Sequence, residues 1–181
     1  MHLTDETLAG QARSDAEAFA ELYRRYAARV YRYHILHTGN IKDAEDLTSQ
    51  TFLAALDGIG RYRRDGMFAA WLMGIARRQK ALFFRSRKPE TPLEQAANLP
   101  AAQTPVDLVV LQRMTLQQAR AAFQLLSPER AEALALCFFA GLSPLEAARV
   151  LGKSQAAVKM LISRGLQDLR VRTTLALEVE S

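Results

Sequence analysis

Closely spaced helix start and stop signals near the C-terminus constrain the fold of this chain more than any other feature. Serine followed by proline, or by glutamate three residues later, favours the first turn of a helix, and glycine favours the residue just past its end. Residues 126–170 carry enough of these signals to predict three short helices, the last ending at about Arg170. The residues concerned are Ser127, Pro128, Gly141, Ser143, Glu146, Gly152 and Ser154.

The spacing around Gly152 predicts that the last two helices form a helix-turn-helix. Ala148 stands four residues before this glycine, where two crossing helices leave space only for a small side chain, and Val158 follows six residues after it. In DNA-binding versions the second helix enters the major groove by its first turns. The residues expected at DNA are Lys153, Ser154, Gln155, Ala157 and Lys159, with Arg164 nearer the backbone. A helical hairpin that binds no DNA is the alternative.

Composition and charge narrow the class of protein. The 181 residues carry a net charge of +5, which favours a polyanionic partner such as nucleic acid, and the hydrophobic fraction of 49% is ample for packed cores. Cys137 is the single cysteine and lies in an apolar run, so we expect a core residue and no disulfide. Neither a signal peptide nor a membrane-spanning run is recognisable, which predicts a cytoplasmic protein without membrane insertion.

Two helices are predicted in the N-terminal part, before and after a break at Gly39–Asn40. The first, residues 16–36, places its aromatic side chains at helical spacing, which favours a core over a base-stacking surface. His34 and His37 lack a nearby third ligand, so no metal is expected. The second helix begins near Asp43, the expected N-cap, and shows an acidic face that is either simply solvated or a docking surface. Its candidate docking residues are Asp43, Glu45, Asp46, Ser49, Gln50 and Leu53.

The segment from Arg61 to Lys88 reverses the charge: it has nine basic residues against one acid, Asp65, with aromatics between them. Basic groups beside aromatic rings suit single-stranded nucleic acid, because they neutralise phosphates and stack on unpaired bases. A solvated helix with core aromatics is the alternative. The candidate DNA-binding residues are Arg61, Tyr62, Arg63, Arg64, Phe68, Trp71, Arg77, Arg78 and Lys80.

Residues 89–107 differ from both flanks. They contain four of the six prolines, three acids and no basic residue, which predicts a linker. The expected fold class is therefore all-α: two small helical domains, residues 1–88 and 108–181, joined by this Pro-rich linker, with the helix-turn-helix in the second.

Three strings in this order resemble the bacterial sigma factors of RNA polymerase, in their short extracytoplasmic-function (ECF) form. They are DAEDLTSQTFL from Asp43, FAAWLMGIARR from Phe68, and LSPER from Leu126 followed by GLSPLEAARVLGKS from Gly141 and AVK from Ala157. The resemblance covers about Phe19 to Arg170.

The resemblance implies a division of labour. Residues 1–88 would be sigma domain two: the face with Asp46 and Gln50 would dock on the clamp coiled coil of the largest polymerase subunit, and the Arg61–Lys88 segment would recognise and melt the start-proximal promoter element. Residues 108–181 would be sigma domain four, which binds the upstream element as duplex and the polymerase flap. An anti-sigma factor is an expected partner; no cofactor and no enzymatic activity are expected.

The chain departs from the family pattern in places. Arg78 stands where asparagine is usual, and Ser49–Gln50 where Gln-Glu is common. Leu161 and Leu166 occupy recognition-helix positions that often carry arginine, and Asp168 follows. Fewer basic groups predict fewer phosphate contacts and a weaker upstream interaction. Two alternatives therefore stay open: a sigma-like decoy that binds an anti-sigma factor, and a free-standing helix-turn-helix regulator.

Overall fold

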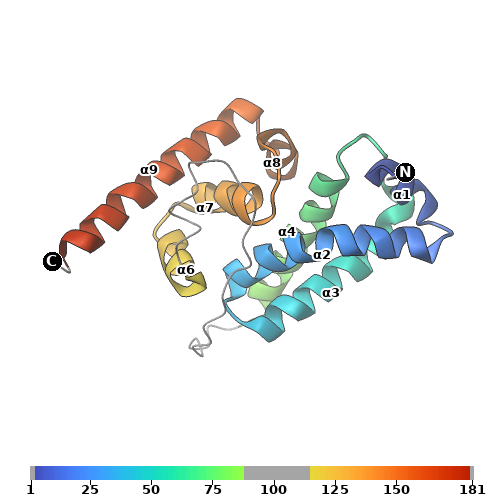
Figure 1. The fold of residues 1–181 in the computed structure, drawn as a ribbon, viewed down its shortest axis with the longest axis horizontal. Coiled ribbons are helices and arrows are strands. Elements are labelled where there is room, and N and C mark those ends of the chain that lie inside the picture. Colours follow the sequence, from blue (N-terminus) through green and yellow to red (C-terminus); the bar gives the residue numbers. More distant parts are fainter. Residues whose placement is uncertain (1–2, 88–114, 180–181) are drawn as a thin grey trace.

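The computed structural model describes residues 3–87 and 115–179, with side chains up to residue 171, and within these ranges every regular element is a helix (Figure 1). This confirms the all-α prediction. The predicted linker, residues 89–107, and the predicted start of the second domain lie outside the described residues.

The N-terminal half comprises α1 (Asp5–Gln11), α2 (Ala16–Thr38), α3 (Ile41–Gly58), the 3-10 turn η1 (Ile59–Arg61) and α4 (Phe68–Ser86). Gly39 ends α2 with a left-handed φ of 64°, as its sequence position predicted. The N-cap of α3 is Asn40, whose side chain accepts a hydrogen bond from the Asp43 backbone N–H at 3.1 Å. The prediction that Asp43 caps this helix is wrong, because the cap lies three residues earlier than the charge pattern suggested.

The C-terminal half contains α6 (Leu116–Gln124), α7 (Pro128–Leu134), a π-helical turn η3 (Ala135–Phe139), α8 (Pro144–Leu151) and α9 (Gln155–Val179). The predicted start and stop signals are confirmed here, but the prediction that the last helix ends at about Arg170 is wrong, because α9 continues to Val179. Ser143 and Glu146 form the capping box, and Gly141 and Gly152 adopt left-handed φ values of 67° and 63°. The π-helical turn had no counterpart in the sequence prediction.

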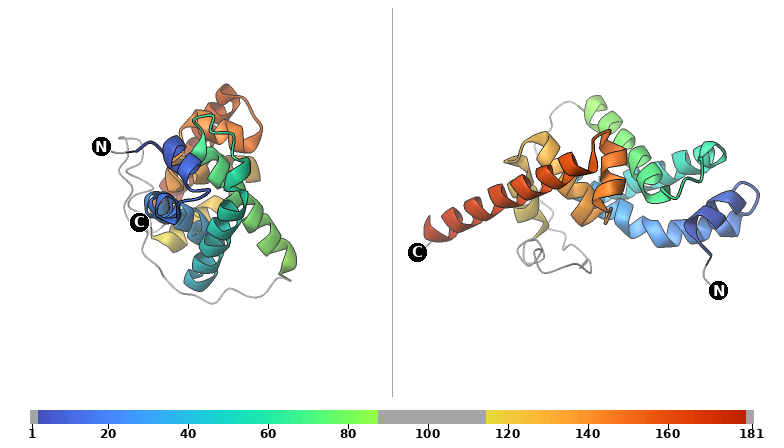
Figure 2. Two further views of the ribbon diagram at one scale, coloured as in Figure 1. Left: turned by 90° about the vertical axis from the view of Figure 1, so that its right-hand side faces the viewer. Right: turned by 90° about the horizontal axis from the view of Figure 1, so that it is seen from above.

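The two halves pack against each other and share one continuous hydrophobic core (Figures 1 and 2). Helix α2 contacts η3 and α6, while α4 contacts α8. The largest fully buried side chains include Leu22 and Tyr33 of α2, Leu72 and Met73 of α4, and Leu134 of α7. The nucleic-acid segment predicted in the first half therefore lies against the helix-turn-helix of the second.

Arginines of α2 contribute directly to this packing. The last carbonyls of a helix have no partner within it. At the end of η3, Arg32 donates to the Phe139 carbonyl at 3.0 Å, and Arg29 donates to the carbonyls of Ala140 and Gly141, both at 2.7 Å. A helix end in one half is thus capped by side chains from the other.

Candidate polymerase and nucleic-acid interfaces

Helix α3 presents a mostly polar outer face because its apolar side chains follow the helical period. Ala44, Leu47, Phe52 and Ala55 are buried, so the positions between them point outward. Of the six predicted docking residues, five are exposed: Glu45, Asp46, Ser49, Gln50 and Leu53. Leu53 is 63% exposed, an unusual solvent position for a leucine in a polar surface.

Asp43 differs from the other five. Both of its carboxylate oxygens accept from Arg87, at 2.8 and 2.9 Å, and its side chain is 14% exposed. This bidentate pair joins the start of α3 to the residue after α4 and is a planar arrangement that arginine favours. Asp43 therefore has an internal role in holding the two helices together.

The aromatic residues of the basic segment form a cluster at the start of α4. Phe68 is buried, and its ring centroid lies 5.3 Å from that of Tyr26 and 5.6 Å from those of Tyr62 and Trp71. Tyr62 is also buried, whereas Trp71 is half-buried. In this arrangement Phe68 serves the core, and Trp71 is the ring of the cluster that retains access to the surface.

The basic residues of this segment also divide into exposed side chains and one that is largely buried. Arg61, Arg63 and Arg64 are exposed on the loop before α4, and Arg77 and Arg78 are exposed on α4 itself. Lys80 is only 14% exposed and its Nζ lies 2.5 Å from Glu132 of α7. Lys80 is thus committed to the contact between the halves.

Two cavities lie between α4 and the C-terminal half. One, of about 500 Å³, brings the rim of the aromatic cluster together with α8; its lining includes Arg61, Tyr62, Arg63, Trp71, Arg78, Arg149 and Val150. The other, of about 520 Å³, is lined by residues that include Arg77, Arg78, Lys80, Glu129, Glu132 and Lys153. Arg149 also forms an ion pair with Asp65 of the loop. Helix α8 therefore covers part of the surface predicted to bind melted DNA.

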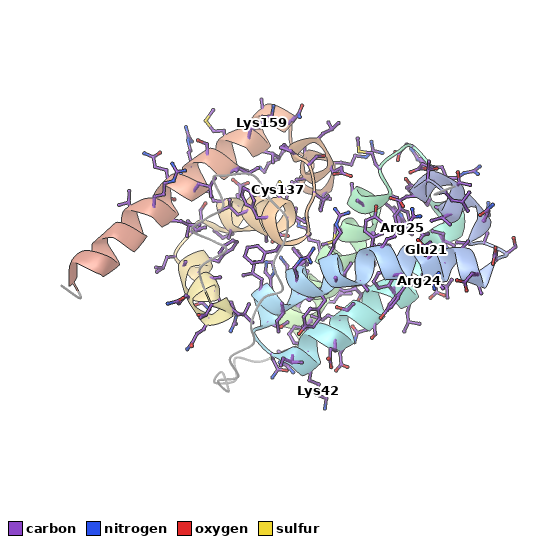
Figure 3. All side chains as sticks on the ribbon, in the orientation of Figure 1. Glu21, Arg24, Arg25, Lys42, Cys137 and Lys159 are labelled. Atoms are coloured by element: carbon purple, nitrogen blue, oxygen red, sulfur yellow. The ribbon has the colours of Figure 1, made fainter. Side chains whose placement is uncertain are left out.

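Helices α8 and α9 have the predicted helix-turn-helix interior. Val158 is fully buried and Ala148 is 5% exposed. Ser154 accepts from the Ala157 N–H at 3.1 Å, which is the expected cap. The predicted DNA-contacting residues Lys153, Ser154, Gln155, Ala157, Lys159 and Arg164 are all exposed, and Lys159 projects outward from the first turns of α9 (Figure 3).

The structure accounts for the residues that depart from the family pattern in α9. Leu161 and Leu166 are partly buried and pack against the core. Asp168 accepts a hydrogen bond from Arg130 of α7 at 2.6 Å. These three side chains anchor α9 to α7 and the core, so the missing basic groups correspond to packing positions.

Glu132 lies at the centre of a polar cluster that sequence reasoning missed. Its carboxylate accepts from Tyr33 at 2.6 Å and from Lys80 at 2.5 Å, and His37 Nε2 lies 3.4 Å away. Burial opposes ionisation, but the hydrogen bond with His37 and the charge of Lys80 outweigh it and hold the pKa of Glu132 well below its usual value. A lone acid in an apolar helix, as in the string AEALALCFF, was the available signal for this cluster.

Among the residues that the structure describes, no group of three or more histidine, cysteine, aspartate or glutamate side chains is placed to hold a metal ion. His34 and His37 have other roles: His34 is buried against Thr51, and His37 joins the Glu132 cluster. No helix among the described residues has the length and apolarity to cross a membrane.

Both halves match known sequence families. Residues 22–90 match the family described as Sigma-70 region 2, and residues 116–169 match Sigma-70, region 4. The RNA polymerase sigma factor CarQ of Myxococcus xanthus is 31% identical over 156 residues, which are 85% of this chain and 88% of CarQ. The ECF RNA polymerase sigma factor BldN of Streptomyces coelicolor is 38% identical over 173 residues, 93% of this chain. The chain spans 64% of the length of BldN.

A solved structure has the same arrangement of helices. CnrH, in complex with the cytosolic domain of CnrY, superposes with a TM-score of 0.68 at 25% identity, covering 98% of this chain and 99% of CnrH. RpoE of Bartonella quintana, solved with the anti-sigma factor NepR, superposes with a TM-score of 0.64 at 22% identity, covering 85% of this chain and 95% of RpoE. At 22% identity, the likeness to RpoE is evidence for the fold alone.

Proposed function

Because this chain belongs to the ECF sigma factors of RNA polymerase, we propose that it directs core RNA polymerase to specific promoters and assists in opening them. The observation that carries the proposal is that sigma region 2 and region 4 sequences occur in order on one chain. Each of these regions also presents an exposed surface suited to its task.

We assign core docking to the outer face of α3, with Asp46 and Gln50 at its centre. Its exposed carboxylates would meet a basic surface, and Leu53 would add apolar contact at the interface. The clamp coiled coil of the largest polymerase subunit is the partner proposed for this face. The flap is the partner proposed for the C-terminal half.

We assign promoter opening to the loop before α4 and to the exposed side of α4. Extruding a base from the duplex costs a few kcal/mol of stacking, which a pocket and phosphate contacts must offset. The cavity beside Trp71 offers a ring and three arginines of the N-terminal half, Arg61, Arg63 and Arg78. Since Arg149 and Val150 of α8 line the same cavity, α8 must move away before this cavity accepts DNA.

The upstream element is assigned to the first turns of α9, where Ser154, Gln155 and Lys159 are exposed at the positions that meet base edges in a helix-turn-helix. On this proposal the protein makes and breaks no covalent bond and works in the bacterial cytoplasm. We also propose that an anti-sigma factor regulates it. The complex of the similar protein CnrH with the cytosolic domain of CnrY is a precedent for binding a separate protein.

Run-off transcription with purified core RNA polymerase and a promoter library tests the proposal. The wild-type protein should yield promoter-specific transcripts, and Asp46→Arg should lose them together with core binding. Glu17→Arg is the matched control, because its side chain is 77% exposed on α2 and the change in charge is the same.

Two other outcomes would replace the proposal. Binding to core without initiation from any promoter would support the decoy. Absence of core binding combined with tight binding to a symmetric duplex would support a free-standing regulator.

A further inference from the structure

Helix α1 precedes the residues that match sigma region 2, yet it contacts the loop that the proposed function assigns to promoter opening. Two adjacent carboxylates on α1 bind different elements. Asp5 accepts from Arg25 at 2.8 Å and from Tyr26 at 2.5 Å, both on α2. Glu6 instead accepts from the Tyr62 hydroxyl at 2.5 Å. Asp5 therefore fixes α1 to the helical core, and Glu6 connects it to the loop.

The Tyr62 hydroxyl also forms a hydrogen bond at the start of α4. A carboxylate only accepts hydrogen bonds, so the Tyr62 hydroxyl donates a hydrogen bond to Glu6 and keeps its oxygen lone pairs free to accept another. One of them accepts the Met67 backbone N–H at 3.2 Å. Met67 is the N-cap residue of α4, and no side chain caps that helix start. This hydrogen bond thus joins Tyr62 and Met67, the two ends of the loop.

Burial keeps the Tyr62 hydroxyl protonated, so that it can donate a hydrogen bond. Together with the neighbouring Glu6 carboxylate, burial raises the pKa of Tyr62 well above its usual value. The other oxygen of Glu6, Oε2, is shut off from solvent and has no hydrogen-bond partner among the described residues. Tyr62 is therefore the polar contact that holds the Glu6 side chain.

Helix α1 also shapes the middle of the loop. Arg64 has a φ of 53°, in the left-handed region that side chains other than glycine seldom adopt. Its side chain lies over Gly10 of α1, where an added Cβ would stand 2.8 Å from Arg64 Nη1 (Figure 1 shows α1 beside this loop). The loop conformation that exposes Arg63 and Arg64 is thus formed against α1.

We propose that Glu6 is a positioning residue for promoter opening, holding the Arg61–Met67 loop through Tyr62 so that its three arginines are set in place before DNA arrives. The inference rests on the proposed function. Its physical basis is preorganisation: a loop already held in the binding conformation loses less entropy when it engages the promoter.

The test uses the full-length protein with core RNA polymerase on a promoter that the wild type transcribes. Open-complex formation is timed on duplex template and on a template already mismatched over the start-proximal element. Glu6→Ala should slow opening of the duplex about tenfold, the factor that corresponds to about 1.4 kcal/mol, and much less on the mismatched template. Glu6→Gln should stay close to wild type, because its amide oxygen still accepts from Tyr62.

Two further variants separate positioning from general stability. Tyr62→Phe keeps the buried ring but loses the hydrogen bonds to both Glu6 and Met67, so it should be at least as slow as Glu6→Ala. The double variant should be no slower than Tyr62→Phe alone, because the contact with Glu6 is then already lost. Glu17→Ala, which removes an exposed carboxylate on α2 that pairs with Arg24 of the same helix, should open the duplex normally.

Unchanged opening by Glu6→Ala, or an equal loss in Glu17→Ala, would overturn the inference. If the wild type itself failed to initiate with core on every promoter tried, the proposed function would fail instead.

Discussion

Glu132→Gln removes the buried negative charge that joins α7 to α2 and α4, with almost no change in shape. Glutamine can still accept from Tyr33, but it cannot neutralise Lys80, whose Nζ lies 2.5 Å from the carboxylate and whose side chain is 14% exposed. Removing one member of a buried ion pair leaves the other without compensation, at a cost of about 3–5 kcal/mol. Because Tyr33 keeps an acceptor, we expect about 3 kcal/mol.

This loss of stability should weaken the packing of the two halves against each other. Glu132 belongs to one half, whereas Tyr33, His37 and Lys80 belong to the other. If the halves unfold together, a loss of about 3 kcal/mol lowers the Tm by about 6–12 °C for a chain of this size. Trp71 is the single tryptophan and lines a cavity with Arg149 and Val150 of α8. Separation of the halves should therefore expose the indole and shift its fluorescence to longer wavelength.

Thermal unfolding and native-state tryptophan emission measure both effects. Glu129→Gln is the matched control: it makes the same change on the same helix, but Glu129 is 62% exposed and pairs with Lys153 of its own half at 2.7 Å. An exposed pair of this kind contributes at most about 1 kcal/mol, so the control should change little.

The result that would refute this reasoning is a Glu132→Gln protein with wild-type Tm and wild-type emission. A second check is Glu132→Gln with Lys80→Met, which removes both charges and keeps an acceptor for the Tyr33 hydroxyl. It should recover at least half of the stability lost by Glu132→Gln, because buried apolar replacements avoid the uncompensated charge. A double variant as unstable as the single one would assign the loss to packing.

Two further predictions concern stability. The pKa of His34 is lowered to about 3 by burial, from the ordinary 6.5, so the unfolded chain binds a proton that the folded chain excludes; stability should fall by up to about 1.4 kcal/mol per pH unit as pH drops from 6.5 to 5. His34→Gln should flatten that slope in urea titrations, and an unchanged slope would exclude His34 as its source. Gly152→Ala places a Cβ in open space at a φ of 63° and should cost only the left-handed penalty of about 1–2 kcal/mol. Gly39→Ala, also at a left-handed φ, should cost somewhat more, because its Cβ would stand 1.7 Å from Arg120 Nη1 and the guanidinium must swing away from the His37 carbonyl; a smaller loss than in Gly152→Ala would contradict that argument.

Local signals predicted most of the helix boundaries correctly. The capping box of Ser143 and Glu146 and the left-handed glycines Gly141 and Gly152 act within one turn of chain, so the sequence states them directly. Asn40 was missed as a cap because the acidic residues after it also suit a helix start.

The candidate sites were predicted less completely. Helical periodicity identified the exposed residues of α3 and α9, whose roles at polymerase and DNA stay predictions. It did not distinguish the exposed Arg77 from the half-buried Lys80 three residues later, because both suit the polar side of an isolated helix. That difference arises only when α7 places Glu132 2.5 Å from Lys80 Nζ; Arg77 Nε lies farther from Glu132, at 3.5 Å, and its side chain stays 48% exposed.

The sequence by itself determined the helices, most of their ends, the helix-turn-helix and the family, because these depend on residues within a few turns of one another. Tertiary structure alone decided that Arg29 and Arg32 cap η3 from more than 100 residues away, and that α8 covers the cavity beside Trp71. It also decided that Glu6 contacts the loop before α4 through Tyr62. Such contacts join side chains whose separation in sequence carries no periodic signal, so they exist only once the helices have packed.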